Sequence, residues 1–248
     1  TFFDPYRIPN LPDRQKGEYL PDRLADEAIN YMKKADRKPF FLCLWNYTVH
    51  WPMEAPEELL KKYKGREGDG LNDTRYGAMI EAMDRSMGRI LQFLDDSGLS
   101  ENTLVVFTSD NGGFGGVADN RPLRAEKGYL YEGGIRVPLV VRWPRVVSPE
   151  TIESTPVIST DFFPTLLEAA SVKVPETYEG DGVSLLPLLK TEEDNFSRDS
   201  IFFHYPNYAF HRSNRLGSAI RCGDHKLIEW LDDGSFELYN LAEDLQES

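Results

Sequence analysis

Three short segments of the sequence carry side chains that could act together on a charged ester. Asp110 and Asn111 offer two oxygen ligands of the kind that calcium and magnesium prefer, and the glycines after them allow a sharp backbone turn. Lys127 stands beside a glycine and could hold an ammonium group against an anion. His50 could hydrogen-bond a substrate oxygen or donate a proton to a leaving group.

Each segment also has a simpler interpretation when it is taken alone. Asn-Gly is a common turn, a single lysine is usually a solvated surface residue, and a histidine after a strand can be merely packed. The coincidence of position favours chemistry, because all three segments follow or join predicted strands, and ligands bind at the C-terminal ends of strands in open α/β sheets. A cation, an ammonium group and a proton donor in one pocket would suit attack on a sulfate or phosphate ester.

The elements that must position these side chains alternate between apolar runs and helical patterns. The clearest helix has apolar residues at helical spacing from Tyr76 to Leu94, a cap at Asp73 and an end at Gly98. The order of elements predicts an α/β fold with a mainly parallel sheet sandwiched by helices. The other predicted elements are buried strands at 40–44, 103–108 and 137–141, a helix with Leu24, Ala28, Ile29 and Met32 on one face, and a helix capped by Ser159 or Thr160 that runs through Phe162, Phe163, Leu166 and Leu167.

The pattern changes beyond about residue 195, where short strand-like runs predict a small antiparallel sheet. The last two runs are joined by Asp232-Asp233-Gly234-Ser235, which is typical of a hairpin turn. We therefore predict two parts: residues 1–195 as part of an α/β domain and residues 196–248 as a small antiparallel β subdomain. The runs are 201–205, 218–221, 226–230 and 236–239.

Composition limits the partners of the protein. The 248 residues carry a net charge of −13, which argues against a nucleic-acid surface because phosphate contacts need clustered Lys and Arg. An acidic protein can still hold one small anion in a locally positive pocket. No apolar run approaches the length that spans a bilayer. Cys43 lies in an apolar run and is expected to be buried, and a disulfide with Cys222 is not expected.

Taken together, these motifs resemble the type I sulfatases, the formylglycine-dependent members of the alkaline phosphatase superfamily. The resemblance runs from about Pro39 to Leu241 and is most specific in the order and spacing of the Asp-Asn-Gly and Lys-Gly…Tyr-Glu-Gly-Gly motifs. The matching segments are His50 with Pro52, Thr108–Gly113, Lys127–Pro138 and Thr160–Thr165.

The resemblance implies a role for each matched residue. Asp110 and Asn111 would be ligands of one calcium ion that grips the sulfate oxygens, and Lys127 would contact a sulfate oxygen. His50 would hydrogen-bond the bridging oxygen and protonate the leaving alcohol. Phosphatases of the same superfamily tend to place His, a zinc ligand, where Asn111 stands, so the residue favours a single hard cation. The resemblance also implies a periplasmic, extracellular or lysosomal location.

The substrate expected from the resemblance is a sulfated carbohydrate, with an aryl sulfate as the less favoured alternative. His204 would contact the rest of the substrate, although a packed histidine is an equal alternative. Arg212 belongs to an aromatic and cationic cluster between two predicted C-terminal strands, which could line a sugar pocket or simply cover the sheet. The other members of this cluster are Tyr205, Tyr208, His211 and Arg215.

One part of the family pattern is absent from the sequence. The formylglycine motif, Cys/Ser-x-Pro-x-Arg, is not found; Ser154-Thr155-Pro156 comes nearest, with Ile158 where arginine is required. The nucleophile and further calcium ligands are therefore expected upstream, and the 248-residue chain alone is expected to have no sulfatase activity. The alternatives are a metal-dependent phosphatase or phosphotransferase of the same superfamily and a non-catalytic protein that retains the fold.

Overall fold

The computed structural model describes residues 1–36, 38–68, 70–191, 195–207 and 214–248, and these form two compact units. The first unit contains Thr1–Ser100 and Phe114–Asp119, and the second contains Glu101–Gly113 and Asn120–Ser248. Each unit has a hydrophobic core of its own. These units divide the chain near residues 100–120. The predicted boundary near residue 195, between an α/β domain and a β subdomain, is a separate division and stays a prediction.

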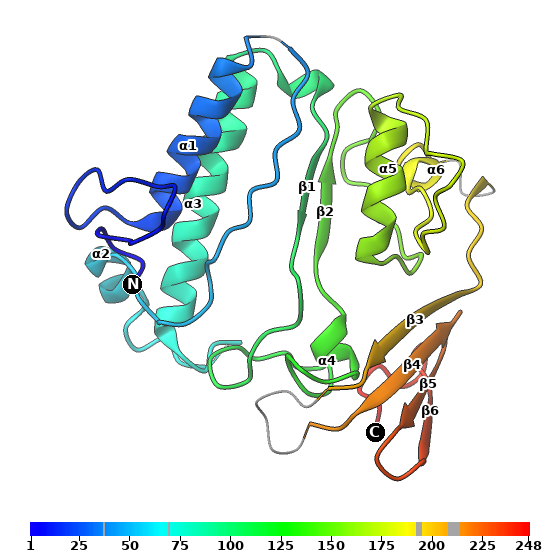
Figure 1. The fold of residues 1–248 in the computed structure, drawn as a ribbon. Helices are drawn as coiled ribbons and strands as arrows, with labels where there is room; N and C mark the ends of the chain where they lie inside the picture. The colour runs from blue at the N-terminus through cyan, green and yellow to red at the C-terminus, as the bar shows by residue number, and fades with distance from the viewer. Residues whose placement is uncertain (37, 69, 192–194, 208–213) are drawn as a thin grey trace. The chain divides into compact units, whose positions relative to one another are not determined.

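The first unit is built around two long helices that lie side by side in Figure 1. They are α1 (Leu20–Lys34) and α3 (Thr74–Asp96), and the short α2 (Glu57–Tyr63) packs against α3. Helix α3 confirms the prediction, because the Asp73 carboxylate accepts a hydrogen bond from the Arg75 N–H at 2.9 Å and so caps the first turn. The apolar stripe of α3 faces the core of this unit.

The buried strand predicted at 40–44 is wrong, because this segment forms no strand. Phe41 is 65% exposed and Cys43 is also exposed, so the expected burial of that cysteine is wrong as well. An apolar run becomes a buried strand only when neighbouring strands satisfy its backbone groups, and no described strand pairs with these residues. Both cysteines are free, which agrees with the expectation of no disulfide.

A two-stranded sheet in the second unit leads into the segments of chemical interest. Strand β1 (Val105–Thr108) pairs with β2 (Leu139–Arg142) in antiparallel register, with Val105 opposite Arg142 and Thr108 opposite Leu139. Both strands are half-buried at most positions, not buried on both faces. The mainly parallel sheet predicted from the sequence is not seen in the described residues, because every strand pair there is antiparallel.

The predicted C-terminal antiparallel sheet is present in the second unit, with strand order β3-β4-β5-β6 (Figure 1). Its inner face buries alternate residues of β5, namely Lys226, Ile228 and Trp230. Alternation of this kind is the normal pattern of a strand that packs on one face. The strands are β3 (Ser200–Tyr205), β4 (Gly217–Cys222), β5 (His225–Trp230) and β6 (Phe236–Asn240).

Short helices complete the second unit. Helix α5 (Phe162–Ala169) confirms the predicted helix, but the predicted cap at Ser159 or Thr160 is wrong, because the N-cap is Asp161. Helix α4 (Glu132–Ile135) is a single turn. Asp161 is fully buried before α5 and forms an ion pair with Arg198, whose Nη1 lies 2.6 Å from a carboxylate oxygen. The remaining elements are α6 (Leu186–Leu189) and two 3-10 turns, η1 (Ser100–Asn102) and η2 (Ser159–Asp161).

Candidate active site

The Asp110-Asn111 pair lies on the loop that follows β1, as the sequence predicts. Asp110 is exposed and Asn111 is half-buried. The Asn111 amide nitrogen donates to the Gly112 carbonyl at 3.0 Å, which turns its oxygen, the atom that can bind a cation, away from that carbonyl. The Ser109 hydroxyl donates to the Asn111 carbonyl at 2.9 Å and tightens the turn. The loop therefore presents a carboxylate and an amide oxygen from adjacent residues.

Main-chain hydrogen bonds join this loop to the segment that carries Lys127. The Lys127 N–H donates to the Gly113 carbonyl at 3.1 Å, and the Gly112 N–H donates to the Gly134 carbonyl at 2.9 Å. A side chain at residue 112 would not fit, because its Cβ would lie 1.8 Å from the Gly133 carbonyl oxygen. The structure thus joins the Asp110-Asn111 loop to the Lys127 backbone. The sequence suggests this proximity only through the positions of the two segments beside predicted strands.

The segment from Arg124 to Gly134, hereafter the Lys127 loop, is closed on itself. The Gly133 N–H donates to the Arg124 carbonyl at 2.8 Å. Ala125 has a left-handed backbone with φ of 62°, a conformation that costs a residue with a Cβ about 1 to 2 kcal/mol. Strained backbone of this kind concentrates at functional sites, where the surrounding structure holds it in place.

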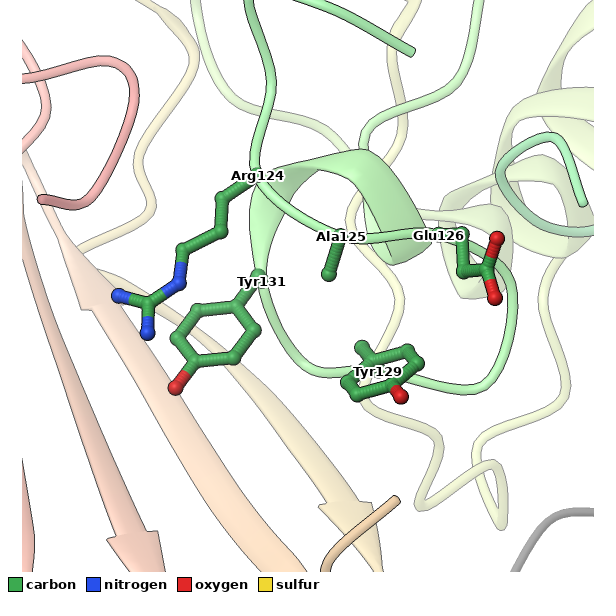
Figure 2. A pocket seen from close by; sticks show the side chains of 5 residues that line it. All are labelled: Arg124, Ala125, Glu126, Tyr129 and Tyr131. Atoms are coloured by element: carbon green, nitrogen blue, oxygen red, sulfur yellow. The ribbon is translucent and has the colours of Figure 1, made fainter. Parts of the chain in front are cut away.

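A pocket of about 510 Å³ opens beside the Lys127 loop. Figure 2 shows the Arg124 guanidinium beside the ring of Tyr131, and its central carbon lies 4.0 Å from the ring centroid. Arg124 also donates to the Tyr239 hydroxyl at 3.0 Å. These contacts make the arginine part of the wall that supports the loop. The lining residues are Arg124, Ala125, Glu126, Tyr129 and Tyr131.

A buried ion cluster lies at the C-terminal end of the Lys127 loop, where α4 begins. Lys226 is 1% exposed, and its Nζ lies 3.0 Å from a Glu132 carboxylate oxygen and 2.7 Å from one of Glu247. The other carboxylate oxygen of Glu247 accepts the Glu132 N–H at 2.6 Å. Burial raises the pKa of Glu247, although Lys226 and the Glu132 N–H act against that rise.

Glu237 forms a second centre of hydrogen bonds on the inner face of the sheet. Its carboxylate accepts from Trp230 Nε1 at 2.8 Å and from the hydroxyls of Tyr131 at 2.8 Å and Tyr239 at 2.7 Å. Burial opposes the charge, but these donors outweigh it and lower the pKa of Glu237. Burial and Glu237 together raise the pKa of Tyr239 to about 12. This centre ties Tyr131, in the Lys127 loop, to β5 and β6.

His50 belongs to the first unit and is exposed. Its Nδ1 lies 3.2 Å from the Trp51 carbonyl oxygen, and its ring centroid lies 5.1 Å from that of Tyr47. A carbonyl oxygen can only accept, so Nδ1 carries a hydrogen and Nε2 is the nitrogen left to exchange a proton. The proton-transfer role that the resemblance implies for His50 stays a prediction.

Of the two residues predicted to contact the substrate, the structure describes His204 but not Arg212. His204 lies on β3, is exposed, and its Nδ1 is 2.9 Å from the Ser218 hydroxyl on the neighbouring strand. Arg212 lies outside the described residues, as do its predicted neighbours Tyr208 and His211. The assignments of His204 and Arg212 to substrate binding therefore stay predictions.

The residues present fit a hard cation in chemistry, and they supply only part of a ligand set. Asp110 and Asn111 offer oxygen atoms alone, which suits calcium better than zinc. In the part of the chain that the structure describes, no group of three or more His, Cys, Asp or Glu side chains could hold a metal ion. The calcium assignment consequently stays a prediction that needs further ligands.

Sequence reasoning missed the groups that support the Lys127 loop. Lys226, Glu132, Glu247 and Arg124 received no role, although Glu132 lies inside the Tyr-Glu-Gly-Gly motif. One signal was available: Lys226 alternates with Ile228 and Trp230, so a lysine stands at an inward-facing strand position. A charge at such a position must find a partner, and the sequence does not say which carboxylate it is.

Comparison with known families agrees with the motifs. The family profile described as Sulfatase matches residues 2–172, and the profile described as N-sulphoglucosamine sulphohydrolase, C-terminal, matches residues 125–248. The chain belongs to the sulfatase family. None of the helices in the described ranges is long and apolar enough to cross a membrane.

Individual relatives give the same result. A protein named Sulfatase from Formosa agariphila is 38% identical over 269 residues, which cover 99% of this chain and 48% of that protein. Steryl-sulfatase from Mus musculus is 37% identical, over 76% of this chain and 30% of the mouse protein. The crystal structure of Ps i-CgsB in complex with k-i-k-neocarrahexaose is 32% identical with a TM-score of 0.82, over 96% of this chain and 52% of that chain. The chain thus spans about half the length of two of these relatives and less of the third.

Proposed function

We propose that the whole protein hydrolyses sulfuric esters and that its substrate is a sulfated carbohydrate. The observation that carries the proposal is the pair of main-chain hydrogen bonds between the Asp110-Asn111 loop and the Lys127 loop, at 2.9 and 3.1 Å. Two oxygen ligands for a cation and one ammonium group then lie on connected loops, an arrangement suited to a sulfate group. Membership of the sulfatase family supports the same reaction.

Each residue has a distinct task in this proposal. Asp110 and Asn111 help to hold one calcium ion, which when bound would withdraw charge from the sulfate oxygens. Lys127 contacts a sulfate oxygen and stabilises the charge that develops on it. His50 donates the proton from Nε2 to the leaving alcohol, while the Trp51 carbonyl holds Nδ1. The formylglycine nucleophile is expected upstream of this chain.

The choice of a carbohydrate rests on the relatives that the chain resembles. The crystal structure of Ps i-CgsB contains a neocarrahexaose, an oligosaccharide, whereas the mouse relative is a steryl-sulfatase. The chain covers 52% of Ps i-CgsB but 30% of the mouse steryl-sulfatase, and this difference favours a sugar substrate. His204 and Arg212 would contact the part of the sugar beyond the sulfate.

We also propose the fold of the whole catalytic domain, which would contain a mainly parallel sheet covered by helices. Residues 1–195 would belong to that domain, and residues 196–248 would form a small β subdomain.

The test uses the whole enzyme with an aryl sulfate, a sulfated oligosaccharide and the matching aryl phosphate. We expect sulfate release from both sulfates, loss of turnover with a calcium chelator, and recovery on adding calcium. Lys127→Ala should lower kcat/KM by about 10²- to 10³-fold. The exposed Lys190 gives the control, because Lys190→Ala should leave kcat/KM unchanged.

Two outcomes would overturn the proposal. A preference for the aryl phosphate would indicate a phosphatase, and unchanged turnover in Lys127→Ala would remove the assigned role. The 248-residue chain alone is expected to show no turnover, because the Cys/Ser-x-Pro-x-Arg motif is absent from it.

A further inference from the structure

Both ends of the Lys127 loop are attached to the same distant residue. At one end the Arg124 guanidinium donates to the Glu247 carbonyl oxygen. At the other end the Glu132 N–H donates to the Glu247 carboxylate at 2.6 Å. Glu247 is fully buried, and Lys226 lies between its carboxylate and that of Glu132. Lys127 stands between these two attachments in the sequence.

We infer that Lys226 and Glu247 are positioning residues for Lys127, and that they set the place of its ammonium group from the C-terminal sheet. The inference rests on the proposed function, because it concerns how the proposed sulfate-binding lysine is held. Lys226 and Glu247 act through the backbone of the loop.

The physical reason is that the buried ammonium group of Lys226 lies between two buried carboxylates, those of Glu132 and Glu247. Glu132 also has two more distant guanidinium partners, Arg136 at 3.7 Å and Arg221 at 3.9 Å. Without Lys226, Glu132 would keep those two partners, but the fully buried Glu247 carboxylate would lose its ion pair beside a second carboxylate, in an interior that disfavours unpaired charge.

The start of α4 would move to separate the two carboxylates or admit water. Gly134 of α4 accepts the Gly112 N–H, and Gly133 closes the loop on Arg124, so the displacement would reach Lys127. A small displacement of a catalytic group can cost about 100-fold in rate.

A double-mutant cycle in the whole enzyme tests the inference. Lys226→Met removes the charge and keeps the length of the side chain. We expect it to lower kcat/KM for an aryl sulfate by about 10- to 100-fold when Lys127 is present. In the Lys127→Ala background the same change should lower kcat/KM by less than about 3-fold, because the group it positions is already gone. The melting temperature should fall equally in both backgrounds.

Two further variants separate positioning from a general loss of folding. Glu247→Gln keeps an acceptor for the Glu132 N–H and removes one charge, so it should fold and show a smaller effect that also disappears without Lys127. Lys226→Arg keeps the charge and should restore part of the lost kcat/KM. The matched control is Arg198→Met, which breaks another buried ion pair in the same unit. Arg198→Met should lower the melting temperature. Its fold-change in kcat/KM should be the same with and without Lys127→Ala, so that the two effects multiply in the double mutant.

The outcomes test the positioning role of Lys226 and Glu247 separately from the proposed sulfatase function. If Lys127→Ala is impaired and the effect of Lys226→Met is the same in both backgrounds, the positioning role is overturned and the proposed function stands. If Lys127→Ala has wild-type turnover, both are overturned. Equal behaviour of Lys226→Met and Arg198→Met in the cycle would also assign Lys226 a structural role only.

Discussion

The Lys127 loop and the His50 segment hold two groups that are proposed to act on the same ester, and they are held in opposite ways. Lys127 stands in a loop attached to residues far along the chain; Glu132 and Lys226 are separated by 94 positions. His50 is oriented by near neighbours, the Trp51 carbonyl and the Tyr47 ring. The first arrangement depends on tertiary structure, and the second is largely encoded in the five consecutive positions 47–51.

This difference predicts how each group responds to substitution at a distance. Changes in the C-terminal sheet should reach Lys127 through α4 and Glu247, because buried ions tolerate little displacement. His50 keeps its partners when distant residues change, since they are supplied by the adjacent backbone.

The largest effect is expected at His50. In the whole enzyme, His50→Ala should lower kcat by about 10²- to 10⁴-fold for a sulfate ester of an alcohol, because general acid catalysis supplies that much. The loss should be much smaller for an aryl sulfate with an acidic leaving group, which needs no proton. Steady-state kinetics on both esters measures the ratio.

Its control is another exposed histidine. His225 lies at the start of β5, and His225→Ala should leave both rates unchanged. An equal loss on the two esters in His50→Ala would contradict the proton-donor role.

The second effect concerns the contact between the Asp110-Asn111 loop and α4. Gly112→Ala would place a Cβ 1.8 Å from the Gly133 carbonyl oxygen, so backbone must move. We expect a loss of about 3 kcal/mol in the free energy of unfolding, at the upper end for overpacking. Urea denaturation measures it, and a higher calcium requirement for turnover should accompany the loss. Stability equal to wild type would show that the two loops separate easily.

The third effect lies at Glu237, which binds the Lys127 loop through Tyr131. Glu237→Gln should cost about 2 kcal/mol near pH 7, because charge-assisted hydrogen bonds are replaced by neutral ones. The pKa of Glu237 is lowered in the folded state, so its stabilisation is present above its ordinary pKa and is lost as pH falls through the folded value. Wild type should therefore lose stability more steeply in acid than Glu237→Gln.

Denaturation at a series of pH values from neutral to acid measures the two slopes. Glu243→Gln is the control, since that carboxylate is exposed and its removal should change stability by less than about 0.5 kcal/mol. Identical acid slopes in wild type and Glu237→Gln would contradict the assignment.

The contrast between local and distant contacts also explains how far the sequence alone reaches. Helix α3, the Asp73 cap and the β5–β6 hairpin were predicted correctly, because periodicity, capping and turn residues are local signals. The run at 40–44 was wrongly predicted as a buried strand, because hydrophobicity does not reveal whether a neighbouring strand is present. The antiparallel pairing of β1 with β2 depends on register across about thirty residues and was missed for the same reason.

The candidate site divides along the same line. Asp110, Asn111 and Lys127 were found from motif and strand-end position, and the hydrogen bonds between their loops agree with that grouping. The Lys226 ion cluster was missed, because no local pattern pairs a lysine on β5 with a carboxylate at the start of α4. The motifs indicate which groups are proposed to bind a ligand, whereas the contacts that support those groups come from tertiary structure.

The smallest effect tests the other side of the comparison, the self-contained first unit. Gly88 is exposed in the middle of α3, and a Cβ built there meets no atom within 4 Å. Gly88→Ala should therefore raise the free energy of unfolding by about 0.5 to 1 kcal/mol, because alanine loses less backbone entropy in a helix. Kinetics on an aryl sulfate should stay at wild type, since α3 supplies none of the proposed catalytic groups. A gain in stability coupled to a change in kcat would show that α3 influences the site, and the first unit could then not be treated as a local scaffold for His50.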